Sequence, residues 1–241
     1  MKTALVTGAS RGIGRAIALK LAENGYAVGI NCANNSDRLA ETAKMIEEAG
    51  GRCELFFGNV SDPAFVKEMF RKMEENYGHL DLLVNNAGIS KVGLFTDMTD
   101  DDWREICGVN LDGAVWCSRE ASRMMVREHR GKIVNISSMW GQVGASCEVM
   151  YSATKGGLDA LTKALAKELA PSNIQVNAIS CGVIDTDMNR CFSEEDREEL
   201  KNEIPAGRFG EAEEVADLLL DLVSGNDYLT GQIIRLDGGM I

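Results

Sequence analysis

Short apolar runs alternate with amphipathic segments along the whole chain. The apolar runs have the length of β-strands and lie at residues 2–7, 27–30, 53–57, 80–84, 132–136, 174–179 and 233–236. Between them, apolar side chains recur at helical spacing, as at Ile13, Ile17 and Leu21. This pattern predicts helices at about 12–24, 36–49, 62–77, 99–128, 151–170 and 211–223.

The order of these elements predicts the fold class. Strands and helices alternate throughout, and several strands are apolar on both faces, which is typical of a parallel sheet covered by helices on each side. We therefore predict an α/β fold, a doubly wound seven-stranded parallel sheet in a single domain over residues 1–241. Ligands of such sheets bind beyond the carboxyl ends of the strands, so candidate site residues should directly follow strands.

Composition limits the partners. The chain has 241 residues, 45% of them hydrophobic, and 25 basic against 37 acidic residues give a net charge of −12. This balance argues against nucleic acid or an anionic membrane surface as the main partner. No apolar run approaches the ~18 residues of a membrane span, and no secretory signal is present, so we expect a cytoplasmic protein. The 7 cysteines are scattered and only 2 histidines are present, so we expect reduced thiols and no metal site.

A glycine-rich turn follows the first strand. Residues 7–14 read TGASRGIG and lead directly into a helix. Glycines let the backbone approach a pyrophosphate, whose charge is stabilised at the helix N-terminus. The strand before the turn and the helix after it together indicate a dinucleotide site. The predicted contacts come from this turn and from the ends of the second, third and fourth strands: Gly8, Ser10, Arg11, Gly12, Ile13, Gly14, Asn31, Cys32, Ala33, Asn34, Asn59, Val60, Asn86, Ala87 and Gly88.

The end of the second strand indicates which dinucleotide is bound. An NAD site usually has a carboxylate there for the ribose hydroxyls. In this chain the residues that follow the second strand, 31–36, contain no acid, and the first one is Asp37. Arg11, in the glycine turn, suits a 2′-phosphate because a guanidinium group binds phosphate through two parallel hydrogen bonds. We predict NADP rather than NAD; the alternative is that Arg11 is a solvated surface charge.

A candidate catalytic group follows the fifth strand. Ser138 comes at its end, and Tyr151 and Lys155 lie four residues apart on one face of the next long helix. An ammonium ~4 Å from a phenol is worth about 4 kcal/mol at an effective dielectric of ~20, so we expect Lys155 to lower the pKa of Tyr151. The phenol would then exchange a proton with a substrate oxygen that Ser138 hydrogen-bonds. Tyrosine and lysine at this spacing alone would be an ordinary pair on a helix surface.

Together these residues resemble the short-chain dehydrogenase/reductase family over essentially the whole length of the chain. The resemblance rests on the glycine turn, on Asn85-Asn86-Ala87-Gly88, on Asn110, Ser138, Tyr151 and Lys155, and on residues 182–188 and 236–239. It implies a Rossmann-type fold, hydride transfer between a nicotinamide and a carbonyl or alcohol carbon, and a homotetramer formed through the helices at 99–128 and 151–170.

The resemblance also implies roles for individual residues. Tyr151 would be the acid/base, Lys155 would lower its pKa and hold the nicotinamide ribose, Ser138 would polarise the carbonyl, and Asn110 would support a proton-relay water. The nicotinamide contacts would be Gly182, Val183, Ile184 and Thr186. The chain departs from the family at Cys181, where a proline usually precedes the glycine; because proline fixes φ, we expect its absence to loosen this loop.

Two substrate classes remain open. Residues 205–210, PAGRFG, are typical of bacterial 3-oxoacyl-[acyl-carrier-protein] reductases, which implies NADPH-dependent reduction of a ketone resembling a 3-oxoacyl thioester. However, a substrate lid expected at about 187–209 is acidic over 193–199 and would repel an acidic carrier.

Residues 140–148 are similar to bacterial reductases that act on a 5-aminopentanone group attached to a lysine of a translation elongation factor. Glu148, three residues before Tyr151, suits a cationic substrate, or alternatively stabilises the start of the helix. Trp140 and Met188 are further substrate candidates. An alternative of another class is a non-catalytic NADP-binding sensor or scaffold.

Overall fold

The computed structural model describes residues 1–187 and 193–241. Its strands form a parallel sheet in the order β3-β2-β1-β4-β5-β6-β7, as the alternating pattern predicted. The strands are β1 (Lys2–Val6), β2 (Tyr26–Cys32), β3 (Arg52–Phe57), β4 (Leu82–Asn85), β5 (Gly131–Ser138), β6 (Ile174–Cys181) and β7 (Ile233–Leu236). The predicted single-domain, seven-stranded Rossmann-type sheet is therefore confirmed.

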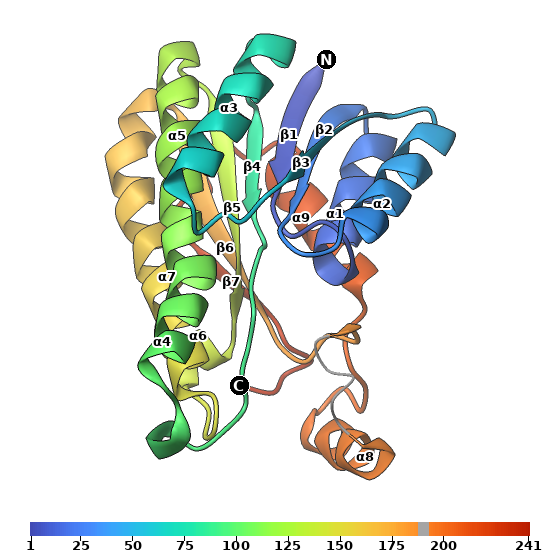
Figure 1. Ribbon diagram of the computed structural model, residues 1–241, viewed down its shortest axis with the longest axis vertical. Coiled ribbons are helices and arrows are strands. Elements are labelled where there is room, and N and C mark those ends of the chain that lie inside the picture. Colours follow the sequence, from blue (N-terminus) through green and yellow to red (C-terminus); the bar gives the residue numbers. More distant parts are fainter. Residues whose placement is uncertain (188–192) are drawn as a thin grey trace.

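Helices cover both faces of this sheet (Figure 1). On one face lie α3 (Pro63–Tyr77), α5 (Gly113–Glu128) and α7 (Val149–Leu169), and on the other α1 (Gly12–Glu23), α2 (Ser36–Glu48) and α9 (Ala212–Val223). Successive strand residues face opposite layers: Leu5 and Leu83 pack with α3 and α5, whereas Val6 and Val84 pack with α1 and α9. Both faces are buried, which is why the strands are apolar throughout.

The predicted long helix over 99–128 is interrupted. It consists of α4 (Asp100–Cys107), a π-helical turn η2 (Gly108–Asp112) and then α5. A π turn inserts one extra residue into a helix and often marks a functional site. Asn110 lies in this turn. The predicted helix was therefore correct in extent but wrong in its regularity, because a π turn does not interrupt the pattern of apolar positions.

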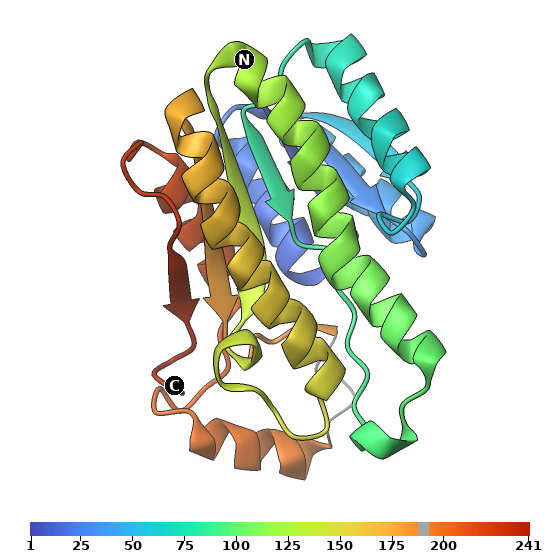
Figure 2. The same cartoon turned by 90° about the vertical axis from the view of Figure 1, so that its left-hand side faces the viewer.

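Two further helices were not predicted. The short α6 (Trp140–Val143) follows β5, and α8 (Glu194–Glu203) forms from the acidic part of the expected lid, with Ser193 and Asp196 as a capping box. Figures 1 and 2 show α8 beyond the carboxyl ends of the strands, at the edge of the sheet where ligands of this architecture bind. Met188 lies outside the described residues, and the lid at 187–209 stays a prediction.

Short turns complete the described chain: η1 (Phe95–Asp97) before α4 and η3 (Ala170–Ser172) after α7. Among the helices of the described residues, none has the length and apolar character that a membrane crossing requires.

Candidate active site

A cleft of about 1080 Å³ opens along the carboxyl ends of the strands. The predicted dinucleotide contacts all lie on its wall: Gly8, Ser10, Arg11, Gly12, Ile13, Gly14, Asn31, Cys32, Ala33, Asn34, Asn59, Val60, Asn86, Ala87, Gly88, Gly182, Val183, Ile184 and Thr186. Ser138, Trp140, Glu148, Tyr151 and Lys155 line the same cleft. Asn110 stands behind the wall rather than on it.

The residues that directly follow strand β4 hydrogen-bond the glycine turn. The Asn86 side-chain amide donates hydrogen bonds to the carbonyl oxygens of Thr7 (2.8 Å) and Gly8 (3.1 Å), and the Thr7 hydroxyl accepts from the amides of Asn86 and Ala87 (both 3.0 Å). A Cβ at Gly14 would collide with the Gly8 carbonyl oxygen and the Asn86 amide, so the turn closes this tightly only with glycine there. No side chain of the described residues caps α1, and its first amides remain able to bind an anion.

Two arginines converge on one carboxylate oxygen at the adenine end of the cleft. Arg11 Nη1 lies 3.4 Å from Asp187 Oδ2, and Arg38 Nη1 forms a short ion pair with the same oxygen. The Asp187 side chain is only 16% exposed, which strengthens these contacts relative to a surface pair. Sequence reasoning missed Arg38, although its place in the first turn of the helix after β2 was a usable signal.

Tyr151 and Lys155 lie one turn apart on α7, next to the end of β5. Lys155 Nζ donates a 2.8 Å hydrogen bond to the Ile136 carbonyl oxygen and lies 5.5 Å from the centre of the Tyr151 ring. Ser138 lies close enough to the Tyr151 side chain to lower its pKa, and its hydroxyl accepts a hydrogen bond from the Trp140 amide at 3.2 Å. The close packing of α6 against α7 brings these groups together: a Cβ at Gly141 would be 2.7 Å from the Lys155 carbonyl carbon.

Burial dominates the proton affinities of this group. It raises the pKa of Tyr151 above its ordinary value; Ser138 opposes this, while the negative charge of Glu148 adds to it. Burial also lowers the pKa of Lys155 to about 8. The expected lowering of the Tyr151 pKa is therefore wrong for this structure, because the desolvation of a buried phenolate outweighs the lowering by Ser138.

Asn110 is fully engaged by its neighbours. Its Oδ1 accepts from the Ile89 amide (2.8 Å), and its Nδ2 donates to the Ile89 carbonyl oxygen (2.9 Å) and to Thr154 Oγ1 (3.3 Å). These bonds join the π turn, the segment after β4 and α7. The Asn110 side chain thus holds these three segments together behind the wall of the cleft.

The loop that starts at Cys181 is well anchored at its start. Cys181 pairs with Ser138 on one side and Leu236 on the other, its carbonyl oxygen accepts from the Met139 amide (2.9 Å), and the Gly182 amide donates to Leu236 (2.9 Å). These bonds hold Cys181 and Gly182 themselves, and the expected loosening of the loop stays a prediction. Burial raises the pKa of the Cys181 thiol to about 12, so it is neutral at physiological pH and unsuited to act as a thiolate nucleophile.

Comparison with known proteins agrees with this geometry. Residues 2–197 match the family described as short chain dehydrogenase. The chain is therefore a short-chain dehydrogenase/reductase. It is 41% identical over 240 residues to the 3-oxoacyl-[acyl-carrier-protein] reductase FabG of Staphylococcus aureus (99% of this chain, 98% of the relative), and 42% identical over 240 residues to FabG of Aquifex aeolicus (99% and 97%). A putative gluconate dehydrogenase from Agrobacterium tumefaciens superposes with a TM-score of 0.95 at 37% identity (99% of this chain, 95% of that chain).

Membership of this family shows that the protein is an oxidoreductase that uses a nicotinamide dinucleotide. The family as a whole includes NAD and NADP enzymes with many alcohols and ketones as substrates, so the cofactor preference and the substrate depend on residues particular to this dehydrogenase.

The substrate side of the cleft is acidic. Glu148 lies beside Tyr151, where the Ser90 hydroxyl donates a 2.5 Å hydrogen bond to its Oε1. Further carboxylates from α4 and α8 line the mouth, namely Glu105, Asp196, Glu199 and Glu203. Sequence reasoning noted the acidic lid but missed Glu105, because only the fold brings α4 to this mouth.

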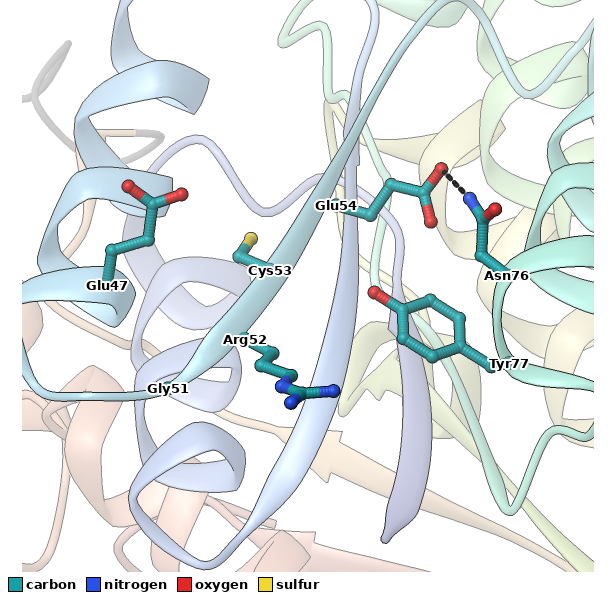
Figure 3. Close-up of a pocket in the computed structure, with 7 residues that line it drawn as sticks. All are labelled: Glu47, Gly51, Arg52, Cys53, Glu54, Asn76 and Tyr77. Atoms are coloured by element: carbon teal, nitrogen blue, oxygen red, sulfur yellow. Dashed lines mark hydrogen bonds between the residues drawn. The ribbon is translucent and has the colours of Figure 1, made fainter.

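A second, shallower hollow lies at the outermost strand of the sheet, along the start of β3 and the ends of α2 and α3 (Figure 3). Its volume is about 440 Å³, and Asn76 donates a 2.8 Å hydrogen bond to Glu54 across it. Burial raises the pKa of Cys53 to about 12, so its thiol stays protonated. The residues that line this hollow include none of the predicted catalytic or cofactor-binding residues.

Replacing Asn110 by alanine would leave the partly buried Ile89 amide and carbonyl unpaired. We expect the free energy of unfolding to fall by about 2–4 kcal/mol, measured by urea denaturation. Thr154→Val, which removes the longest of the Asn110 contacts and the hydrogen bond of the Thr154 hydroxyl to the Tyr151 carbonyl oxygen, is the control and should cost less, about 1–1.5 kcal/mol. Equal losses for the two variants would show that Asn110 does not brace this dehydrogenase.

Proposed function

We propose that this dehydrogenase reduces a ketone to a secondary alcohol with NADPH, and that Tyr151 donates the proton. The observation that carries the proposal is that Ser138, Tyr151 and the buried Lys155 line the same cleft as the glycine turn. These are the groups that carbonyl reduction requires: a donor to the oxygen, a second donor to polarise it and a cation to stabilise the phenolate.

The lining of the cleft supports binding of a dinucleotide. The braced glycine turn and the uncapped N-terminus of α1 are suited to the pyrophosphate. Tyr151 and Lys155 would hold the nicotinamide ribose, and residues from Gly182 to Thr186 would contact the carboxamide. When bound, the nicotinamide supplies the hydride that adds to the carbonyl carbon.

The protein side groups complete the reduction. Ser138 donates a hydrogen bond to the carbonyl oxygen and so favours the developing negative charge. Tyr151 transfers its hydroxyl proton to that oxygen, which gives the alcohol and leaves a phenolate. The raised pKa of Tyr151 keeps this proton in place at neutral pH, and the ammonium of Lys155 stabilises the phenolate until it is reprotonated from solvent.

Tyr151→Phe removes the transferred proton and little else. We expect kcat to fall by at least ~10²-fold, followed as the loss of NADPH absorbance, while the dissociation constant for NADPH stays within about threefold. The matched control, Tyr77→Phe in the hollow along β3, should keep wild-type turnover. Near-wild-type turnover of Tyr151→Phe would contradict the assignment.

The arginines at the adenine end support NADP over NAD. An anionic oxygen already lies between Arg11 and Arg38, in the form of the Asp187 carboxylate, so this place accepts negative charge. A 2′-phosphate carries more charge than the carboxylate and more oxygens for two guanidinium groups. We propose that it takes over the arginine contacts of Asp187.

Arg38→Gln is expected to raise the dissociation constant for NADPH about tenfold and to change that for NADH less than threefold, since one charge-assisted hydrogen bond is worth about 1.5–3 kcal/mol. Quenching of the intrinsic fluorescence on titration measures both. Arg71→Gln, on the outer face of α3, is the matched control and should change neither constant. A parallel weakening for both dinucleotides would exclude a role of Arg38 in recognising the phosphate.

Two substrate classes follow from different observations. The relatives named 3-oxoacyl-[acyl-carrier-protein] reductase support a 3-oxoacyl thioester. The acidic lining supports a positively charged ketone such as a 5-aminopentanone group on a protein lysine, because Glu148 lies next to the proton donor and the mouth repels an acidic carrier. We favour the aminoketone, since the carboxylates that line the substrate side complement a positive charge.

Glu148→Gln separates these substrates. We expect kcat/KM for a small aminoketone to fall about tenfold or more, from the loss of one close ion pair, and kcat/KM for an acetoacetyl thioester to stay equal or rise. Glu105→Gln, at the outer mouth, is the control and should have a smaller effect on the aminoketone. A Glu148 variant that affects both substrates alike would leave the helix-stabilising role as its explanation.

Assays with these ketones also test the alternative that the protein is a non-catalytic NADP-binding sensor or scaffold. A sensor or scaffold would bind NADPH tightly and oxidise it with none of the ketones. The homotetramer stays a prediction of the family resemblance, and the cytoplasmic location stays a prediction from the sequence.

A further inference from the structure

A buried acid lies beneath the catalytic pair. Asp159 is 6% exposed and follows Lys155, itself 4% exposed, by one turn of α7. Tyr151, Lys155 and Asp159 recur at four-residue spacing, so they lie in sequence along one strip of the helix. A carboxylate in such a place costs several kcal/mol unless a nearby cation compensates it.

The sheet does not satisfy this acid with hydrogen bonds. Ser137 and Ser180 are paired across β5 and β6, and alternation along the strands turns both toward α7, as it does Ile133 and Val176. Both serines are buried, and Ser137 lies near enough to lower the pKa of Asp159, which burial raises. Within the described chain, however, Asp159 Oδ1 and both hydroxyl oxygens have no partner in full hydrogen-bond geometry.

A buried acid with an unpaired oxygen destabilises the fold. Two lysines of the same helix favour its charged form, Lys163 and then Lys155. Two groups raise the pKa of Lys155 against the effect of burial: Cys181, from β6, and then Asp159, from the same helix. The Cys181 thiol is neutral at physiological pH. Glu148 acts on Tyr151, and the other cation near Asp159 is Lys163, one turn further along α7. Asp159 is therefore the group that supplies Lys155 with negative charge.

We propose that Asp159 is a positioning residue that keeps Lys155 protonated, and thereby sets the alkaline limit of proton transfer by Tyr151. This inference rests on the proposed carbonyl reduction. Lys155 stabilises the Tyr151 phenolate only while it is charged, and burial already favours its neutral form. Without the charge of Asp159, Lys155 loses its proton at lower pH, and the reductase loses activity there as well.

Asp159→Asn tests this with nearly the same shape. We expect the alkaline limb of the kcat/KM profile, measured with NADPH and a reducible ketone, to move about one pH unit toward acid, with the rate near pH 6 within about threefold of wild type. Asp159→Glu should restore the limb. Thr162→Val is the matched control: it removes an uncharged buried partner of Asn135 on the same helix and should leave the limb in place.

A second measurement does not depend on turnover. Acetylation of Lys155 by acetic anhydride, quantified by mass spectrometry over a pH series, reports its deprotonation directly, and the Asp159→Asn curve should shift in the same direction by about one unit. Asp159→Leu, which removes the charge together with the unpaired oxygen, provides the same test if the asparagine variant folds poorly.

An unshifted labelling curve in both variants would overturn the proposal, as would a rate that falls equally at every pH. A shifted labelling curve without any ketone turnover in the wild type would instead contradict the proposed function and leave the role of Asp159 standing.

Discussion

The buried ammonium of Lys155 is the interaction on which the cleft depends. Its hydrogen bond to the Ile136 carbonyl oxygen ties α7 to the end of β5, and that bond places Tyr151 beside Ser138. A lysine in such a dry place is costly, since burial favours its neutral form. The cost is useful, because a charge with little water around it acts on the neighbouring phenol far more strongly than a surface lysine would.

The parallel sheet supplies the geometry for this pair. Every strand of the described chain points its carboxyl end to the same edge, so the glycine turn after β1, the amides after β4 and Ser138 after β5 meet in one cleft. Side-chain hydrogen bonds then fix that edge: Asn86 braces the glycine turn, and Asn110 braces the segment after β4 against α7. The Asn86 amide donates to two backbone carbonyl oxygens, and the Asn110 amide bonds the backbone of Ile89 and the Thr154 hydroxyl, so these bonds hold the wall without a ligand.

Charge divides the cleft into two regions. Guanidinium groups lie at the adenine end, whereas carboxylates from α4 and α8 and from Glu148 line the substrate end. This asymmetry favours an anionic cofactor phosphate at one end and a cationic substrate at the other. The net charge of −12 did not reveal that several of the acidic residues line the substrate end of the cleft.

The sequence by itself determined the fold class and most of the cleft wall. Alternation of apolar runs with helical spacing specifies a parallel sheet, and parallel strands bring whatever follows them to one edge, so Gly14, Asn86 and Ser138 could be placed from their positions alone. Only the tertiary structure decided the rest. Arg38 and Glu105 reach the cleft through contacts between segments far apart in the chain, the π turn at Asn110 leaves the apolar pattern unchanged, and the direction of the Tyr151 pKa depends on burial. Periodicity encodes which side of an element is buried; desolvation and distance between side chains arise only once the elements pack.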